Sequence, residues 1–372
     1  MVTPGLEPFA IAEAEALGIN AVAEPGGFAW QGTAESALVA NVGLRIASRV
    51  LVRLASFEAR SFAELERHAR KVEWARVIAP GGSVRFRVTC KKSKLYHSDA
   101  VAQRLADAVK RALPGVRAEG ASVGEDDAEE VADDAALVVV RVMRDRCTVS
   151  ADSSGALLHR RGYRLASTKA PLRETIAAGL LAASDWDLAS PLVDPLCGSG
   201  TIPIEAALLS RGVHPGAHRN FAMERWPTTP EGLGDIIRRR DVTRSGVISA
   251  TIVASDRDAG AITAAADNVA RAGVRDHISF AIHSLSAATF PKAPKGWIVT
   301  NPPYGVRVGE ADRVRDLWAQ LGNVLRERAS GWRLAVLSPD VALDRQLRIP
   351  LRAAASLSNG GIPVRIMIGE IG

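Results

Sequence analysis

The feature that most constrains the fold of this chain is an apolar strand that runs into a glycine-rich turn and then a helix. Residues 191–194 have the composition of a short buried strand, Gly198 and Gly200 occupy the turn, and residues 202–210 have a helical pattern. Glycine adopts backbone conformations that other residues disfavour and lets the chain approach a ligand closely. Ligands of open parallel sheets bind where strands end, so this turn is a candidate binding site. The alternative is an ordinary strand-to-helix turn.

The rest of the second half repeats this alternation of strands and helices. Apolar strands are expected at 248–254, 297–300, 332–338 and 364–368, and a helix at 259–272. Short apolar strands separated by helices are typical of a doubly wound sheet. We therefore expect an α/β, Rossmann-like domain in this half.

The first half alternates strands and helices without a strict parallel rhythm. Helices are expected at 6–17 and 98–113, and strands at 84–88 and 136–142. The acidic stretch 119–134 is expected to be a solvated loop. The pattern indicates an α+β region. With 372 residues, the chain is long enough for two or three domains.

Positive charge is concentrated in this first half. Of a net charge of +6, residues 67–111 carry +9 and residues 141–173 carry +6, whereas residues 174–372 carry only +2. Basic segments suit a polyanion, and phosphate contacts position a nucleic acid without reading its sequence. The alternative is a solvated charged face. The lysines expected to contact a nucleic acid are Lys91, Lys92 and Lys94.

The cysteines give little support to a metal site or a disulfide framework. Cys90, Cys147 and Cys197 lie far apart, without a CxxC pair or a Cys/His cluster. We expect no metal and a reducing, cytoplasmic location. No apolar run reaches the roughly 18 residues of a membrane span, and the N-terminal residues lack the pattern of a signal peptide. We therefore expect no membrane partner.

Two carboxylates accompany the glycine turn. Asp194 ends the first strand and Asp256 ends the next one. Asp256 can accept both hydroxyls of a ribose, and Asp194 can accept hydrogen bonds from an amino group. The turn lacks the Gly-Lys-Ser/Thr of a phosphate-binding loop, and proline at 203 breaks GxGxxG. The set fits S-adenosylmethionine. An alternative role for Asp256 is a helix N-cap, which Asp258 could fill instead.

The turn Asn301-Pro302-Pro303-Tyr304 follows the strand 297–300. The prolines lack N–H donors and leave carbonyls free to accept, Asn301 adds a side-chain carbonyl, and Tyr304 offers a flat face. This set suits a planar base with an exocyclic amino group. Hydrogen bonds to Asn301 and to the Pro302 carbonyl would orient that amine toward a methyl group. The alternative is a rigid proline turn.

Several longer segments carry a family resemblance: LLHRRGYR (157–164), APLRETIAA (170–178), DPLCGSGTIPIEAA (194–207), PGAHRNFAMERWP (215–227), SDRDAGAI (255–262), VTNPPYGVR (299–307) and SNGGI (358–362). With these segments the chain resembles the THUMP-containing RNA guanine-N2 methyltransferases of the large-subunit rRNA type, which are class I enzymes using S-adenosylmethionine. Residues 86–109 resemble the THUMP core.

The resemblance implies four parts: a ferredoxin-like region at 1–66, a THUMP RNA-binding domain at 67–150, a linker at 151–185 and a Rossmann-like methyltransferase domain at 186–372. It implies methyl transfer to the N2 amino group of a guanine, in 23S rRNA first and tRNA second. The HRRGYR segment together with Cys197 favours the rRNA branch.

The resemblance also assigns residues. The methionine side of the cofactor would contact Asp194, Cys197, Gly198, Ser199, Gly200 and Thr201. Asp256 would bind the ribose and Arg257 would lie beside the adenine. The catalytic turn would be Asn301, Pro302, Pro303 and Tyr304. RNA would contact Arg160, Arg161 and Arg164. Ser284 stands where the family usually has an aspartate that receives the adenine amino group, so we expect somewhat looser cofactor binding.

Three alternatives stay open besides rRNA: a tRNA guanine-N2 methyltransferase, a DNA amino methyltransferase and a non-catalytic RNA-binding protein. The THUMP-like half argues against DNA, and Ser284 is the only feature that favours the non-catalytic protein. Carbon-directed methylation through a thiolate is disfavoured, because Cys197 lies in the presumed cofactor loop.

Overall fold

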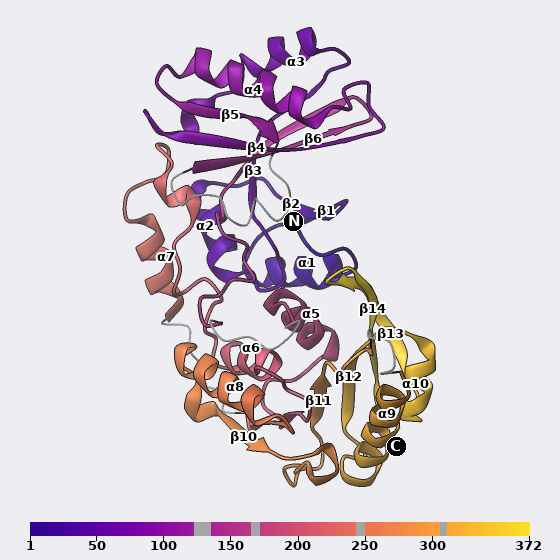
Figure 1. The fold of residues 1–372 in the computed structure, drawn as a ribbon. Helices are drawn as coiled ribbons and strands as arrows, with labels where there is room; N and C mark the ends of the chain where they lie inside the picture. Colours follow the sequence, from indigo (N-terminus) through magenta and orange to yellow (C-terminus); the bar gives the residue numbers. More distant parts are fainter. Residues whose placement is uncertain (123–134, 165–171, 243–249, 306–310) are drawn as a thin grey trace.

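A computed structural model describes residues 1–122, 135–164, 172–242, 250–305 and 311–372 of the chain. Figure 1 shows three layers along the long axis: a five-stranded sheet with helices α3 and α4 at the top, the N-terminal region in the middle, and a seven-stranded sheet with its helices at the bottom. No helix in this described part of the chain is long and apolar enough to cross a membrane.

The seven-stranded sheet has the order β10-β9-β8-β11-β12-β14-β13. Its strands are β8 (Leu192–Asp194), β9 (Ile252–Asp256), β10 (Ile278–Ile282), β11 (Trp297–Thr300), β12 (Arg333–Ser338), β13 (Arg352–Asn359) and β14 (Ile362–Glu370). The strands β10, β9, β8, β11 and β12 are parallel, and β14 runs antiparallel to β12 and β13. The chain moves outward from β8 to β10 and then returns to the other side of β8 with β11. This reversal places a topological switch point between β8 and β11.

The expectation of a doubly wound α/β domain is therefore confirmed. Its helices are α5 (Glu174–Ser184), α6 (Thr201–Ser210), α7 (Leu233–Val242), α8 (Ala259–Arg271), α9 (Ala311–Arg328) and α10 (Val341–Leu347). Helix α5 lies inside the segment expected to be a linker, and it packs on the sheet, because Trp297 Nε1 donates to the Ser184 carbonyl at 2.9 Å. The predicted strand at 248–254 is found as β9, whereas positions 248 and 249 lie outside the described residues.

The five-stranded sheet has the order β3-β7-β6-β4-β5 and mixes parallel with antiparallel pairs. Its elements are β3 (Leu51–Glu58), α3 (Phe62–Ala69), β4 (Ser83–Lys91), α4 (Ser98–Ala112), β5 (Arg117–Ser122), β6 (Ala135–Met143) and β7 (Arg146–Asp152). The alternation predicted within β4 is confirmed: Val84, Phe86 and Val88 are buried, and Phe86 meets Trp74 edge to face with ring centroids 6.3 Å apart. The α+β expectation for this half is thus confirmed.

One expectation in this half is wrong. Residues 119–122 belong to β5 and are not part of a loop, because β5 pairs with β4 at the edge of the sheet. A polar edge strand of this kind is hard to distinguish from a loop by composition alone. Residues 123–134 of the predicted acidic loop lie outside the described residues.

The N-terminal region consists of α1 (Glu7–Ala16), the hairpin β1 (Val22–Glu24) and β2 (Gly27–Ala29), and α2 (Ala34–Gly43). It packs against the seven-stranded part: an added Cβ at Gly179 of α5 would lie 2.7 Å from Leu6. Strand β3 pairs with β7, with Leu51 opposite Asp152, so residues 51–58 belong to the five-stranded sheet. The predicted division at residue 66 is not tested by this pairing alone and stays a prediction.

Candidate active site

Parallel pairing brings the ends of β8, β9 and β11 to the same edge of the seven-stranded sheet. At the switch point, the hydroxyl of Thr300, the last residue of β11, donates to Asp194 Oδ1 at 2.7 Å. Both side chains are buried, with Asp194 1% exposed and Thr300 0% exposed. This bond ties the strand that carries the Asn-Pro-Pro-Tyr turn to the strand that precedes the glycine loop.

Burial has a chemical consequence for Asp194. Desolvation raises the pKa of its carboxyl to about 7, and the charge of Asp256 acts in the same direction. The hydrogen bonds donated by Thr300 and by the Leu196 N–H oppose this shift. A positive charge placed beside this carboxyl would stabilise its anion and lower its pKa again.

The glycine loop is held against the neighbouring strand. Gly198 and Gly200 have φ values of 52° and 84°, in the left-handed region where glycine is favoured. The Gly198 N–H donates to Asp256 Oδ2 at 3.0 Å, and the Cys197 N–H donates to the Ser255 carbonyl at 3.0 Å. A Cβ at Gly200 would lie 3.1 Å from the Cβ of Ala265 in α8. The loop therefore has little freedom to accommodate other residues at these positions.

Asp256 holds this loop and does not cap a helix. Its Oδ1 accepts the Asp258 N–H at 3.0 Å, and Asp258 itself is the N-cap of α8, accepting from the Gly260 N–H at 2.8 Å. The alternative N-cap role for Asp256 is thus filled by Asp258. A second hydrogen bond holds the far side of the loop: Asn268 Nδ2 donates to the backbone carbonyl of the buried Ser199 at 3.1 Å.

The Cys197 side chain is buried at 8% exposure. Burial raises the pKa of its thiol well above the usual range, and the charges of Asp194 and Asp256 add to the effect. The neutral thiol is a poor nucleophile. This environment agrees with the expectation that no cysteine thiolate drives the chemistry.

Arg257 and Ser284 are both exposed at the same edge of the sheet. The Ser284 hydroxyl lies 2.9 Å from that of Ser286. The end of β10 is aligned with β9, since the His283 N–H donates to the Asp256 carbonyl at 3.1 Å. The structure thus places Ser284 after the strand next to Asp256, as expected, with its hydroxyl already engaged by a neighbour.

The Asn-Pro-Pro-Tyr turn is internally bonded. The Tyr304 hydroxyl donates to Asn301 Oδ1 at 2.5 Å, and burial raises the pKa of Tyr304 to about 12, so the hydroxyl stays protonated. Pro302 is buried and Pro303 is exposed. A carbonyl oxygen has two lone pairs, so Asn301 can accept a second hydrogen bond.

Two residues that support this turn were not identified from the sequence. Asn359 Nδ2 donates to the Tyr304 hydroxyl at 3.2 Å, and Trp318 Nε1 donates to the Pro303 carbonyl at 3.2 Å. Asn359 lies in the SNGGI segment, which carried the resemblance without a role. Among the residues that the structure describes, none donates a hydrogen bond to the Pro302 carbonyl.

The basic residues expected to contact RNA lie in two different environments. Lys91, Lys92 and Lys94 are exposed at the end of β4, near Tyr96, which is 70% exposed. The loop is held to the turn between β6 and β7, because the Lys94 N–H donates to Asp145 Oδ1 at 2.8 Å. These lysines are therefore accessible to a polyanion.

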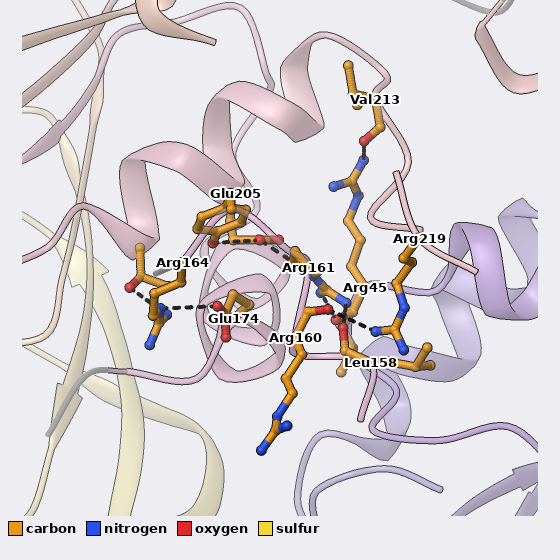
Figure 2. Close-up of polar contacts among 12 residues, drawn as sticks. Arg45, Leu158, Arg160, Arg161, Arg164, Glu174, Glu205, Val213 and Arg219 are labelled. Atoms are coloured by element: carbon orange, nitrogen blue, oxygen red, sulfur yellow. Dashed lines mark hydrogen bonds and ion pairs between the residues drawn. The ribbon is translucent and has the colours of Figure 1, made fainter. Parts of the chain in front are cut away.

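The prediction for Arg161 is wrong. Its side chain is only 5% exposed, and its guanidinium lies 3.6 Å from Glu205 and donates to the Leu158 carbonyl. A cation used internally in this way cannot reach a phosphate. Arg164 is also engaged, by Glu174 at 3.1 Å and by the Thr201 hydroxyl at 2.9 Å. Figure 2 shows these contacts, and it shows the exposed Arg160 guanidinium pointing away from the other labelled side chains.

A cavity of about 640 Å³ lies between the N-terminal hairpin, the five-stranded sheet and the segment 223–229. Its lining includes Trp30, Arg53, Arg76 and Arg141. Arginine and aromatic side chains together suit a nucleotide.

The described residues contain no group of three or more His, Cys, Asp and Glu side chains arranged to hold a metal ion.

Models of known protein families match three parts of the chain. Residues 161–364 match the RMKL-like methyltransferase domain, residues 1–51 match the RlmL ferredoxin-like domain, and residues 59–152 match the THUMP domain. The methyltransferase match covers more than half of the chain.

Individual proteins are similar over the whole chain. The protein slr0064 of Synechocystis sp., described as a candidate RNA methyltransferase, is 31% identical over 100% of this chain and 95% of its own. The ribosomal RNA large subunit methyltransferase K/L of Syntrophotalea carbinolica is 34% identical over 99% of this chain. The chain spans about half the length of that relative, 52%.

A solved structure shares the fold. SMU.472, a candidate methyltransferase crystallised with S-adenosylhomocysteine (SAH), superposes with a TM-score of 0.85 at 26% identity, over 100% of this chain and 97% of its own. The seven-stranded sheet is therefore that of a class I methyltransferase. The chain belongs to the RMKL-like methyltransferase family, with an RlmL ferredoxin-like domain and a THUMP domain ahead of the catalytic domain.

Proposed function

We propose that this protein transfers a methyl group from S-adenosylmethionine to the exocyclic N2 amino group of a guanine in RNA, with large-subunit rRNA as the substrate. The observation that carries the proposal is the arrangement at the switch point. Thr300 joins the buried Asp194 to the strand that ends in Asn301 and Tyr304, so a donor site and an acceptor site lie at adjacent strand ends.

The residues of the loop fit the methyl donor. Asp194, Asp256 and the backbone of Cys197–Thr201 offer carboxylates and peptide groups, which suit amino and hydroxyl groups better than phosphates. When bound, S-adenosylmethionine supplies an electrophilic methyl group on a sulfonium sulfur. Asp194 would hold the amino group of the methionine part, Asp256 would hold the ribose, and Arg257 and Ser284 would lie toward the adenine. Gly198, Ser199 and Gly200 would bring the backbone into contact.

The turn fits the amine. Asn301 Oδ1 and the Pro302 carbonyl would each accept a hydrogen bond from the guanine amino group and orient its lone pair. Tyr304, locked to Asn301 and Asn359, would stack on the base. Pro303, fixed by Trp318, keeps the turn rigid. Positioning of this kind can supply much of the rate acceleration, and no strong base is required.

The RNA would be held by basic residues at the end of β4 and in the HRRGYR segment. Lys91, Lys92 and Lys94 would contact phosphates, and Arg160 is the one exposed arginine of the HRRGYR segment that remains in the proposed footprint. A guanine in structured RNA must be flipped out or already unpaired to reach Tyr304. In place of the boundary predicted at residue 66, we propose one before Leu51 between the ferredoxin-like and THUMP parts, because β3 joins the sheet that β4–β7 form.

The K/L relatives are named for the large-subunit ribosomal RNA, which supports rRNA over tRNA. These relatives extend beyond the matched segment, so the proposal covers only the activity that this chain's own residues support. Cysteine usage supports a cytoplasmic location.

The test is transfer of labelled methyl from S-adenosylmethionine to three unmodified substrates: large-subunit rRNA, tRNA and duplex DNA. The proposal expects incorporation into rRNA, with little into tRNA and none into DNA. Incorporation into tRNA alone would make tRNA the substrate in place of rRNA. Incorporation into DNA alone would overturn the RNA assignment. Binding of SAH without transfer to any of the three would favour a non-catalytic RNA-binding protein.

A further inference from the structure

The HRRGYR segment holds one face of helix α6. The Tyr163 hydroxyl donates to Glu205 Oε1 at 3.0 Å, and Arg164 Nη2 donates to the Thr201 hydroxyl at 2.9 Å. Thr201 and Glu205 are four residues apart and therefore lie on the same side of the helix. The segment thus contacts α6 at two successive turns, the first of which is the start of the helix.

The start of α6 is also the end of the glycine loop. Gly200 is the N-cap of α6, and its backbone N–H donates to the Cys197 carbonyl at 2.9 Å. The other side of the loop is bonded to Asp256 through the Gly198 N–H. A displacement of Thr201 would therefore move the loop relative to Asp256. The hydrogen bond between the Gly198 N–H and Asp256 shapes the proposed donor site, so this movement would disturb it.

Arg164 is itself fixed from two sides. Its Nε lies 3.1 Å from Glu174 of α5, and its Nη2 also donates to the Leu172 carbonyl at 2.6 Å. The side chains of Arg164 and Glu174 are 14% and 3% exposed. Figure 2 shows the two side chains facing each other. With its head group held by α5, Arg164 presents a fixed donor to Thr201.

Arg161, which precedes Arg164 in the same segment, connects this group of polar contacts to the N-terminal region. Arg161 Nη2 donates to the Arg45 carbonyl at 2.5 Å. The Glu13 carboxylate accepts the backbone N–H groups of Arg45 and Ile46, at 2.8 and 3.1 Å. Arg161 and Glu205 are almost fully buried, so their removal would endanger the fold. Arg164 is more exposed than Arg161 and Glu205, so it is the residue changed in the test.

We propose that Arg164 is a positioning residue for the methyl-donor loop: by holding Thr201 it fixes the start of α6 and thereby the glycine loop against Asp256. This inference rests on the proposed function, in which that loop binds the donor. It also assigns a role to the HRRGYR segment that differs from RNA contact.

The test measures SAH binding by calorimetry, without RNA, to the wild type and to Arg164→Ala, Thr201→Val and the double variant. Each single change is expected to weaken binding about ten-fold. The double variant should be no weaker than the weaker single variant, because both changes remove the same hydrogen bond. RNA affinity should stay within about two-fold of wild type.

Arg238→Ala is the matched control. Arg238 of α7 is 15% exposed and pairs with Glu224 at 2.9 Å, so it resembles Arg164 in its own burial and pairing. Within the described part of the chain its hydrogen bonds go to Arg219, Glu224 and Asp235, none of which lies in α6. It should bind SAH as the wild type does. A weakening in Arg238→Ala equal to that in Arg164→Ala would show a general effect of removing a buried ion pair and would overturn the proposal.

Other outcomes are equally decisive. Wild-type affinity in Arg164→Ala overturns the inference, as does strict additivity in the double variant, which would mean that Thr201 acts independently of Arg164. If Arg164→Ala fails to fold, Thr201→Val decides, and wild-type affinity there overturns the inference. Absence of SAH binding in the wild type would instead contradict the proposed function, so the two failures are distinguishable.

Discussion

The hydroxyl of Tyr304 donates a hydrogen bond to the side-chain carbonyl of Asn301, three residues earlier in the same turn. The ring that would stack on a base and the amide that would orient its amine are therefore one unit. Asn359, the last residue of β13, holds the same hydroxyl. The geometry of the catalytic turn thus depends on a hydrogen bond between segments 55 residues apart.

Replacement of Asn301 by alanine is expected to lower methyl transfer about 100-fold or more, because the amine then keeps only the Pro302 carbonyl as an acceptor and is no longer held in one orientation. SAH affinity should stay within a few fold, since Asn301 belongs to the acceptor side. Tyr304→Phe keeps the ring and removes only the hydroxyl, and transfer should fall about ten-fold. Single-turnover transfer and calorimetry on the same preparations check both. Persistent activity in Asn301→Ala would remove the turn from the mechanism.

Asp194 predicts a pH dependence of donor binding. Its pKa is raised to about 7, and the ionised form is the one that attracts an amino group. SAH affinity should therefore increase as the pH rises through about 7, by about ten-fold between pH 6 and pH 8. Asp194→Asn should bind weakly and with a flat profile. A wild-type profile that is equally flat would contradict the role of Asp194.

The same shift has a consequence for stability. The folded pKa lies above the unfolded one, so the native state binds more protons between about pH 4 and pH 7. The contribution of Asp194 to the stability of the ligand-free protein should be fully present at low pH and should disappear as the pH rises through about 7. Thermal melts of wild type and Asp194→Asn, compared at pH 5 and pH 8, measure this contribution.

Ser284→Asp is expected to tighten cofactor binding by about 3–10-fold, because a carboxylate is a stronger acceptor for the adenine amino group than a hydroxyl. Ser286→Asp adds the same charge beside it and serves as the control. If both variants bind SAH alike, the effect is one of general charge and Ser284 does not face the adenine.

Charge reversal of Lys91, Lys92 and Lys94 to glutamate should weaken RNA binding and flatten its salt dependence. The slope of log K against log salt should fall by roughly 0.7–0.9 for each phosphate that the protein no longer neutralises. The matched control reverses three exposed basic residues at the end of α3, Arg67, Arg70 and Lys71. Equal slopes in the wild type and in the Lys91, Lys92 and Lys94 variant would exclude these lysines from the footprint.

The sequence was sufficient to predict the features whose chemistry is local. The glycine loop, the two aspartates at strand ends and the Asn-Pro-Pro-Tyr turn lie within short segments, and strand pairing brings them to one edge of the sheet. Alternating apolar and basic residues predicted β4, because the period of two directly reports a strand with one buried face.

Features that depend on distant partners were missed. Arg161 has the same local pattern whether it faces solvent or Glu205, which lies 44 positions later, so the sequence could not reveal its burial. Asn359 is remote from Tyr304 in the chain. The edge strand β5 has too few apolar residues to be distinguished from a loop, and only its pairing with β4 identifies it.

Identification of the methylated nucleoside tests the proposed activity most directly. Unmodified large-subunit rRNA is incubated with the protein and labelled S-adenosylmethionine, digested to nucleosides and analysed by mass spectrometry, with Asn301→Ala in parallel. We predict N2-methylguanosine in the wild-type reaction and almost none with Asn301→Ala. Methyl label found only on adenine, or N2-methylguanosine at equal levels in both reactions, would contradict the proposed activity.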